Sequence, residues 1–206
     1  MALTTYTELK TSVADWLNRA DLTAVIPDFI TMAEAKFNRE LRTRDMLTSL
    51  DASADAASET LPADFLQEYS LEYATPTGYV TLTPIGEAEA KEFRAGLMSG
   101  NTRYYSIFGS SLYFIPTPGT AFTYRLKYYA KIPVLSAGNA TNWLLTKSPD
   151  LYLHGSLLEA APYLKNDERL ATWSALRQQE IDAMNLESER AMRSSTNLVV
   201  KRRTLG

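Results

Sequence analysis

The period of the apolar residues changes twice along this chain, and this change constrains the fold more than any other sequence feature. In the first third, apolar side chains recur every three or four residues in two stripes, made of Tyr6, Leu9, Val13, Trp16 and Leu17 and of Phe29, Ala33, Phe37 and Leu41. Such spacing places each stripe on one face of a helix. The last third repeats the helical spacing, whereas the middle alternates apolar and polar residues. The sequence therefore predicts helices at both ends and strands between them.

Start signals locate the predicted helices. Thr5 and Glu8 have the spacing of a capping box, in which each side chain accepts a hydrogen bond from the other residue's free amide. Pro27 suits the first turn of a second helix. Ser148 followed by Pro149 marks the start of a third helix, because serine caps a helix and proline fits its first position.

Short strands and one short helix are predicted in the middle of the chain. The strands cover residues 69–73, 79–83, 104–108, 112–115 and 121–129, and the helix covers residues 87–97. In the last strand Tyr124 and Leu126 point one way, while Arg125 and Lys127 point the other. Residues 51–59, DASADAASE, show no period and are predicted to form a loop.

The predicted fold is α+β: a four-helix bundle with an inserted small antiparallel β-rich subdomain and an extended C-terminal tail. The third helix is expected to end at Pro162, and the fourth to begin near Asp167. Helices on both sides of an insertion must pack together to bury their stripes. We expect residues 1–60 and 136–190 to form the helical bundle, residues 61–135 the β-rich insertion, and residues 191–206 an extended basic tail.

Composition and motifs remove most kinds of active site. The chain has 206 residues, no Cys and one His, so thiol catalysis, Cys-ligated metal sites and two-histidine metal sites are excluded. Glycine-rich nucleotide loops and a serine nucleophile elbow do not occur in the sequence. His154 lies among leucines at helical spacing, which favours a structural role. We expect no enzymatic activity, no cofactor and no metal.

The first residues give no targeting signal. MALTTY contains no basic segment followed by an apolar core. Apolar runs in the sequence stay well below the roughly 20 residues that span a bilayer. We expect a soluble protein that is made in the cytoplasm and has no membrane partner.

Charge separates the body of the chain from its end. The chain has 21 Lys and Arg and 24 Asp and Glu, a net charge of −3. Four cations and no acid lie in residues 191–206, which leaves −7 on residues 1–190. A basic end is typical of an interaction tail, although a role in solubility alone is also common. A small nucleic-acid-binding module that uses this tail therefore stays open as an alternative function. The tyrosine-rich middle of the chain, with Arg125 and Lys127, could also offer stacking platforms to single-stranded nucleic acid, although alternating aromatics in a small sheet more often form its own core.

A set of short segments forms a pattern of hydrophobic and turn residues over nearly the whole chain. The segments are residues 6–10 (YTELK), 14–17 (ADWL), 26–30 (IPDFI), 33–34 (AE), 61–66 (LPADFL), 128–129 (YY), 132–133 (IP), 135–136 (LS), 142–145 (NWLL), 149–164 (PDLYLHGSLLEAAPYL), 167–169 (DER) and Trp173. In these segments, and most closely in residues 149–164, the chain resembles the head-to-tail adaptor, or connector, proteins of tailed bacteriophages.

The resemblance implies a structural virion protein without enzymatic activity, assembled in the host cytoplasm and placed at the head–tail junction. Proteins of this type form a ring, typically twelvefold, that binds the portal protein and a downstream tail or nozzle protein. Genome DNA passes through the ring during ejection without specific binding, and attachment of tail fibres to the ring is left open. In several adaptors a C-terminal extension docks onto the portal. This implies portal binding here by Thr196, Asn197, Leu198, Val199, Val200, Lys201, Arg202 and Arg203.

Overall fold

The computed structural model describes residues 3–95, 100–164 and 169–193, with the backbone alone for Arg193. Contacts within the chain divide it into two compact units. The helical unit consists of Met1–Asp45 and Ile132–Gly206, and the β unit consists of Met46–Lys131. The β unit is thus inserted into the sequence of the helical unit.

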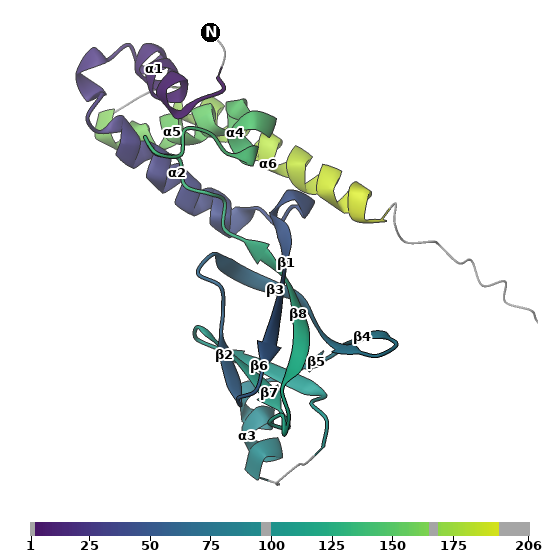
Figure 1. The fold of residues 1–206 in the computed structure, drawn as a ribbon. Coiled ribbons are helices and arrows are strands. Elements are labelled where there is room, and N and C mark those ends of the chain that lie inside the picture. The colour runs from purple at the N-terminus through teal and green to yellow at the C-terminus, as the bar shows by residue number, and fades with distance from the viewer. Residues whose placement is uncertain (1–2, 96–99, 165–168, 194–206) are drawn as a thin grey trace, which may run out of the picture. The chain divides into compact units, whose positions relative to one another are not determined.

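The helical unit contains five α-helices in its described part, labelled in Figure 1. They are α1 (Tyr6–Leu17), α2 (Ile26–Glu40), α4 (Trp143–Lys147), α5 (Pro149–Leu164) and α6 (Leu170–Arg193). Two short 3-10 helices, η1 (Ala20–Leu22) and η2 (Arg44–Met46), lie before and after α2.

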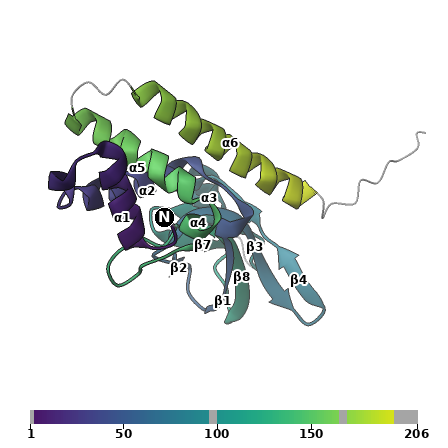
Figure 2. The same cartoon turned by 90° about the horizontal axis from the view of Figure 1, so that it is seen from above.

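The helix α5 lies at the centre of the helical unit. It contacts α1, α2, α4 and α6, and α6 runs alongside it (Figure 2). Four consecutive residues of α5 are buried, Leu151, Tyr152, Leu153 and His154, so no face of this helix is open to water over that turn. A helix that is buried on every side forms the middle of a core. The helices α1 and α2, in contrast, each bury one face.

The predicted helix starts are confirmed, and one predicted stop is wrong. Thr5 Oγ1 accepts a hydrogen bond from the Glu8 N–H at 3.3 Å, and the Glu8 carboxylate accepts one from the Thr5 N–H at 3.0 Å, which completes the capping box. The helix α5 begins at Pro149 but continues through Pro162 to Leu164. Proline removes one backbone hydrogen bond from a helix. In the last turn of a buried helix, packing outweighs that loss.

The β unit contains two four-stranded sheets. The first sheet has the order β1 (Leu47–Ala54), β8 (Phe122–Ala130), β3 (Phe65–Thr75), β4 (Gly78–Thr81), and all its neighbours are antiparallel. The second sheet has the order β2 (Ser58–Thr60), β7 (Ser111–Ile115), β6 (Tyr104–Phe108), β5 (Thr83–Pro84), with β5 and β6 parallel. The helix α3 (Glu87–Ala95) packs against β6 and β7.

One hydrophobic core joins the strands of both sheets. Its buried members are Ala54, Leu61, Leu71, Leu82, Tyr105, Leu112, Phe114, Tyr124, Leu126 and Tyr128. The Phe114 ring contacts the rings of Phe122 and Tyr124, each with a centroid distance of 5.3 Å. Part of the tyrosine-rich sequence of this region therefore forms the core of the β unit.

The prediction of a four-helix bundle with a small β-rich subdomain is wrong. The structure is α+β, but the described residues form six α-helices and two full sheets, and the β unit has a core of its own. The third predicted helix, α5, is directly preceded by the extra short helix α4, and the predicted strands are joined by strands that the sequence analysis missed. The first three residues of the predicted extended tail, 191–193, form the end of α6 instead, and the rest of the tail lies outside the described residues.

The predicted loop over residues 51–59 accounts for much of this error. The strand β1 includes residues 51–54 of this segment and pairs with β8 along the whole length of β1. The strand β2 includes residues 58 and 59. Ala54 belongs to the core of the β unit, and Leu50 and Ala52 pack against this core. Alanine has a low strand propensity, so tertiary pairing decides the conformation of this segment.

Candidate protein-interaction site

The predicted portal-binding residues 196–203 lie outside the described residues. The described part of the chain ends at Arg193, the last residue of α6. The role of residues 196–203 in portal binding therefore stays a prediction.

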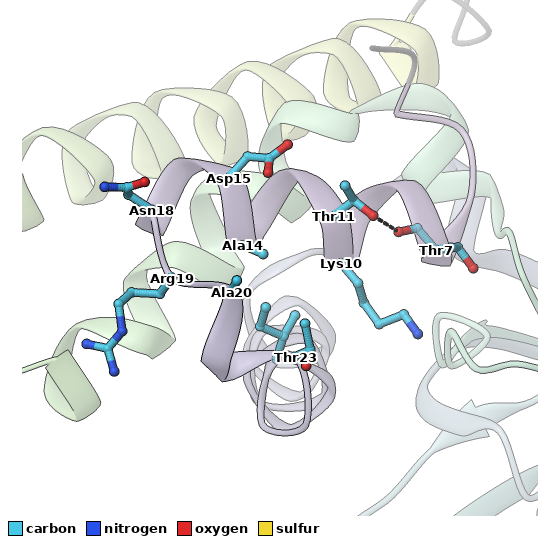
Figure 3. A pocket seen from close by; sticks show the side chains of 10 residues that line it. Thr7, Lys10, Thr11, Ala14, Asp15, Asn18, Arg19, Ala20 and Thr23 are labelled. Atoms are coloured by element: carbon cyan, nitrogen blue, oxygen red, sulfur yellow. Dashed lines mark hydrogen bonds between the residues drawn. The ribbon is translucent and has the colours of Figure 1, made fainter.

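A groove of about 550 Å³ lies along one face of α1 (Figure 3). The side formed by α1 and its C-cap consists of polar or small residues, namely Thr7, Lys10, Thr11, Ala14, Asp15 and Asn18. The other side is formed by Arg19, Ala20, Thr23 and Ile26. The groove therefore lies between α1 and the segment that leads into α2.

A tight turn after α1 shapes this groove. Asn18 caps α1 in the left-handed conformation, with φ of 53°, and its N–H donates to the carbonyls of Ala14 and Asp15. Asparagine tolerates this conformation better than most residues. Directly after the turn, the Arg19 guanidinium makes two hydrogen bonds of 2.7 Å to the Asp21 carboxylate. These contacts reverse the chain at the end of α1.

The groove has mixed charge and is open to water. Lys10 and Arg19 lie toward opposite ends of it, and Asp15 lies between them along α1 (Figure 3). Thr11 Oγ1 donates to the Thr7 carbonyl at 3.0 Å, which leaves its oxygen able to accept a further hydrogen bond. Short hydroxyls and isolated charges in an open groove suit contact with a protein segment.

A buried polar network fixes the segment between β8 and α4 on the helical unit. Glu34 of α2 is 3% exposed, and its Oε1 accepts hydrogen bonds from the Leu135 N–H at 2.9 Å and the Tyr152 hydroxyl at 3.0 Å. The Asn142 amide donates to the Tyr152 hydroxyl and to the Pro133 carbonyl, both at 2.7 Å. Burial raises the pKa of Glu34 because it disfavours the charged carboxylate.

His154 links three helices. Its Nδ1 lies 2.8 Å from Glu180 Oε1 on α6, and its ring meets the Trp16 ring of α1 edge-on at a centroid distance of 5.9 Å. Burial raises the pKa of Glu180. His154 is 8% exposed. These contacts describe a packed structural residue, as the sequence analysis expected.

The outer face of the first sheet carries paired charges. Arg125 of β8 makes two hydrogen bonds, of 2.6 and 2.7 Å, to Asp51 of β1, and Lys127 donates to Glu72 of β3 at 2.6 Å. The hydrogen bonds from Arg125 lower the pKa of Asp51. The Arg125 guanidinium also lies 4.3 Å from the Tyr79 ring centroid. The cations that could have formed a stacking platform for nucleic acid are thus engaged within the sheet.

The groove residues were missed by sequence reasoning. The signal that could have found them is the second stripe of α1, where Thr7, Thr11, Ala14 and Asn18 recur at three- and four-residue steps opposite the apolar stripe. Polar stripes usually face water. The groove forms only because the chain turns back beside this stripe, and the sequence period carries no information on that turn.

The described residues contain no cluster of three or more His, Asp and Glu side chains that could hold a metal ion. Glu87 forms an ion pair with Lys91, one helical turn further along α3, at 2.6 Å. Within the part of the chain that the structure describes, none of the helices is long and apolar enough to cross a membrane.

The family of the chain is given by a comparison with family models, because the geometry of the site does not identify it. The model of the SU10 adaptor protein matches residues 4–201, which takes in both units. No curated protein matches the chain. The family match confirms the resemblance to phage adaptor proteins, which are virion components that contact other structural proteins of the phage. The chain therefore belongs to the SU10 adaptor protein family, and it is a phage structural adaptor protein.

Proposed function

We propose that the chain forms a ring at the head–tail junction, where it joins the portal protein to the next tail or nozzle protein and surrounds the DNA passage. The observation that carries this proposal is the adaptor family match over residues 4–201. An adaptor that contacts a different protein on each side needs two separate surfaces. The division of the chain into a helical unit and a β unit supports the proposal, because each unit has a surface of its own.

The charge of the body supports the passage of DNA through such a ring. Residues 1–190 carry a net charge of −7. A negative lining repels phosphate groups, so that a duplex slides past it, whereas a basic lining binds DNA strongly. The paired Arg125 and Lys127 agree with this, because ion pairing reduces the positive charge that they present.

A role in binding rather than catalysis follows from the same features. The single histidine is packed between Glu180 and Trp16. The groove on α1 carries hydroxyls and mixed charges in an open setting. We assign the protein no enzymatic activity and no cofactor, and we place it in the virion.

The tail is proposed to dock on the portal through its apolar residues. Buried aliphatic side chains contribute roughly 1.5 to 3 kcal/mol each, whereas exposed ion pairs contribute under about 1 kcal/mol. Leu198, Val199 and Val200 should therefore matter at least as much as the neighbouring cations. Nucleic-acid binding by the tail, the second candidate, reverses this order because phosphate contacts depend on charge.

Two tail variants separate these functions. One changes Leu198, Val199 and Val200 to Ser, and the other changes Arg193, Lys201, Arg202 and Arg203 to Gln. Co-sedimentation with the portal and binding to duplex DNA are measured for both across a salt series. We expect the apolar variant to lose the portal, and the wild type to bind DNA weakly at physiological salt.

The opposite result would establish the second candidate. In that case the wild type binds DNA tightly, and the charge variant lowers the log–log salt slope by about 3.6, since each lost phosphate contact contributes about 0.9. Unchanged portal attachment in both variants would overturn the docking role of the tail. Electron microscopy of the portal complex tests the ring itself.

A further inference from the structure

The first sheet has a long unprotected edge at β1. This strand runs over Leu47–Ala54 and pairs with β8 without a bulge, and among the described backbone hydrogen bonds none is made by its other edge. Alternate residues of an edge strand point their N–H and C=O groups outward. Proteins usually protect such an edge with Lys, Pro or a bulge. The only charge on β1 is Asp51, and it is bonded to Arg125.

The opposite edge of the same sheet is the shorter strand β4. The Leu82 N–H donates to the Leu71 carbonyl at 2.8 Å. The backbone N–H and C=O groups of Val80, two residues before Leu82, therefore also point toward β3. Tyr79 and Thr81 alternate with these residues, so their backbone N–H and C=O groups point away from β3, toward the open edge of the sheet. Val80 and Tyr79 are each 45% exposed. The strand β4 contains no charge and no proline.

The edges of the second sheet are of a different kind. The strand β2 has three residues, and β5 has two, one of which is Pro84. Very short strands and proline are devices that prevent edge-to-edge pairing. The first sheet thus keeps two edges that can pair, whereas the second sheet does not.

The directions of the strands make the two open edges complementary. The sheet is antiparallel throughout, so β4 runs opposite to β3 and β1 runs opposite to β8. A second copy placed with its β1 beside β4 continues this alternation without a break. The two faces of the strands also correspond. Val80 lies opposite Tyr73 on the core side of the sheet, where Leu50 of β1 also packs. Thr81 lies on the outer side, as Ser49 of β1 does.

We propose that β4 of one copy pairs antiparallel with β1 of the next copy, so that the first sheets join edge to edge around the ring. This inference rests on the proposed ring. A contact between two different edges is heterologous, and heterologous contacts form a ring when the rotation between copies closes, whereas pairing of β1 with itself stops at a dimer. Backbone hydrogen bonds supply the contact, and Tyr79, Val80 and Thr81 are residues that favour strands.

The spacing of strands gives the size of such a ring. Four strands about 4.8 Å apart span roughly 19 Å, so twelve copies give a circumference of about 230 Å and a diameter of about 73 Å at the sheet. This diameter leaves the centre of the ring open. Only Tyr79 and Thr81 of β4 offer outward groups, so each junction is weak on its own and needs the portal to align the copies.

Cysteine cross-linking tests the pairing cleanly because the natural chain has no Cys. The test variant carries Ser49→Cys and Thr81→Cys, which are both exposed on the outer face. A short bis-maleimide is added to the full chain bound to the portal. We expect a ladder of covalent oligomers that extends to the complete ring. The matched control carries Ser49→Cys and Ser110→Cys, with the second cysteine in the turn between β6 and β7, and should give no ladder.

Other outcomes would contradict either the strand pairing or the proposed function. Portal-bound rings that show no ladder would overturn the strand pairing and leave the proposed function intact. Dimers from Ser49→Cys alone would show that β1 pairs with itself, and a cross-link to another phage protein would show a different occupant of the edge. Failure of the wild type to bind any portal would overturn the proposed function instead.

A charge on the edge provides a second test that does not depend on cross-linking. Thr81→Lys adds a cation on the outer face of the edge strand β4, next to the proposed junction, as natural edge strands do to prevent pairing, and we expect loss of the ring on the portal. The matched variant Thr77→Lys adds the same charge in the exposed turn of the hairpin and should retain the ring. Equal assembly of both variants, with unchanged melting temperatures, would contradict the pairing.

Discussion

Buried polar residues decide how the helical unit is held together. The Tyr152 hydroxyl hydrogen-bonds to both Glu34 and Asn142, and these two residues hydrogen-bond to the backbone of the segment that returns from the β unit. Nothing in the local sequence around these three residues marks them as members of one network. Their pairing joins parts of the chain more than a hundred residues apart, and a period of three or four residues contains no information at that range.

At the residue scale, we expect His154 to contribute stability rather than activity. His154→Gln keeps a donor for Glu180 and should cost about 1 kcal/mol, whereas His154→Ala leaves a partly buried carboxylate without its partner and should cost roughly 1 to 3 kcal/mol. Thermal unfolding measures both. Portal co-sedimentation of His154→Gln should equal that of the wild type.

A normal melting temperature with loss of portal attachment in His154→Gln would reopen a functional role for this residue. Glu180→Gln is the control from the other helix. It should lower the free energy of unfolding by a similar amount, because the two side chains form one contact between α5 and α6.

At the element scale, the sequence predicted the strands and helices whose periods are regular. The strands β6 and β8 and the starts of α1 and α5 lie close to the predicted positions. The first half of β3 was missed because register shifts around Leu66 and Tyr69 break its alternation. The strand β1 was missed because its core residues are mostly alanine. In both cases the neighbouring strand β8, not the local sequence, determines the conformation.

The close approach of α2 and α5 gives a prediction at the same scale. A Cβ atom added at Gly155 would lie 2.5 Å from Phe37 Cζ. Phe37 is fully buried and meets the Tyr152 ring edge-on at 5.3 Å, so its ring has little room to move. We expect Gly155→Ala to destabilise the protein by about 1 to 3 kcal/mol through overpacking, despite the better helix propensity of alanine.

Chemical denaturation measures this effect, and Gly138→Ala is the control. An added Cβ at Gly138 meets only the Ser136 hydroxyl at 4.0 Å, so that variant should be close to neutral. Phe37→Leu should partly rescue Gly155→Ala, since it removes the atom in conflict. Equal stability of Gly155→Ala and the wild type would show that the two helices can move apart at little cost.

At the scale of the whole molecule, we expect the free protein to be monomeric and to form its ring on the portal. A permanent oligomer usually buries a large apolar interface. The exposed edge of β4 offers only a short run of backbone groups, with Tyr79 and Val80 half exposed. Light scattering at micromolar concentration should therefore report one chain. A stable ring without the portal would contradict this expectation.

The pairing of Leu47 with Tyr129 has a consequence for how the chain folds and changes over evolution. The two ends of the β unit leave it side by side, on adjacent strands. Once this unit has folded, the helices before and after it are joined by a short tether. Closing the same gap with an unfolded segment of this length costs about 4 kcal/mol of chain entropy. Another domain whose ends lie equally close could take its place without disturbing the helical core.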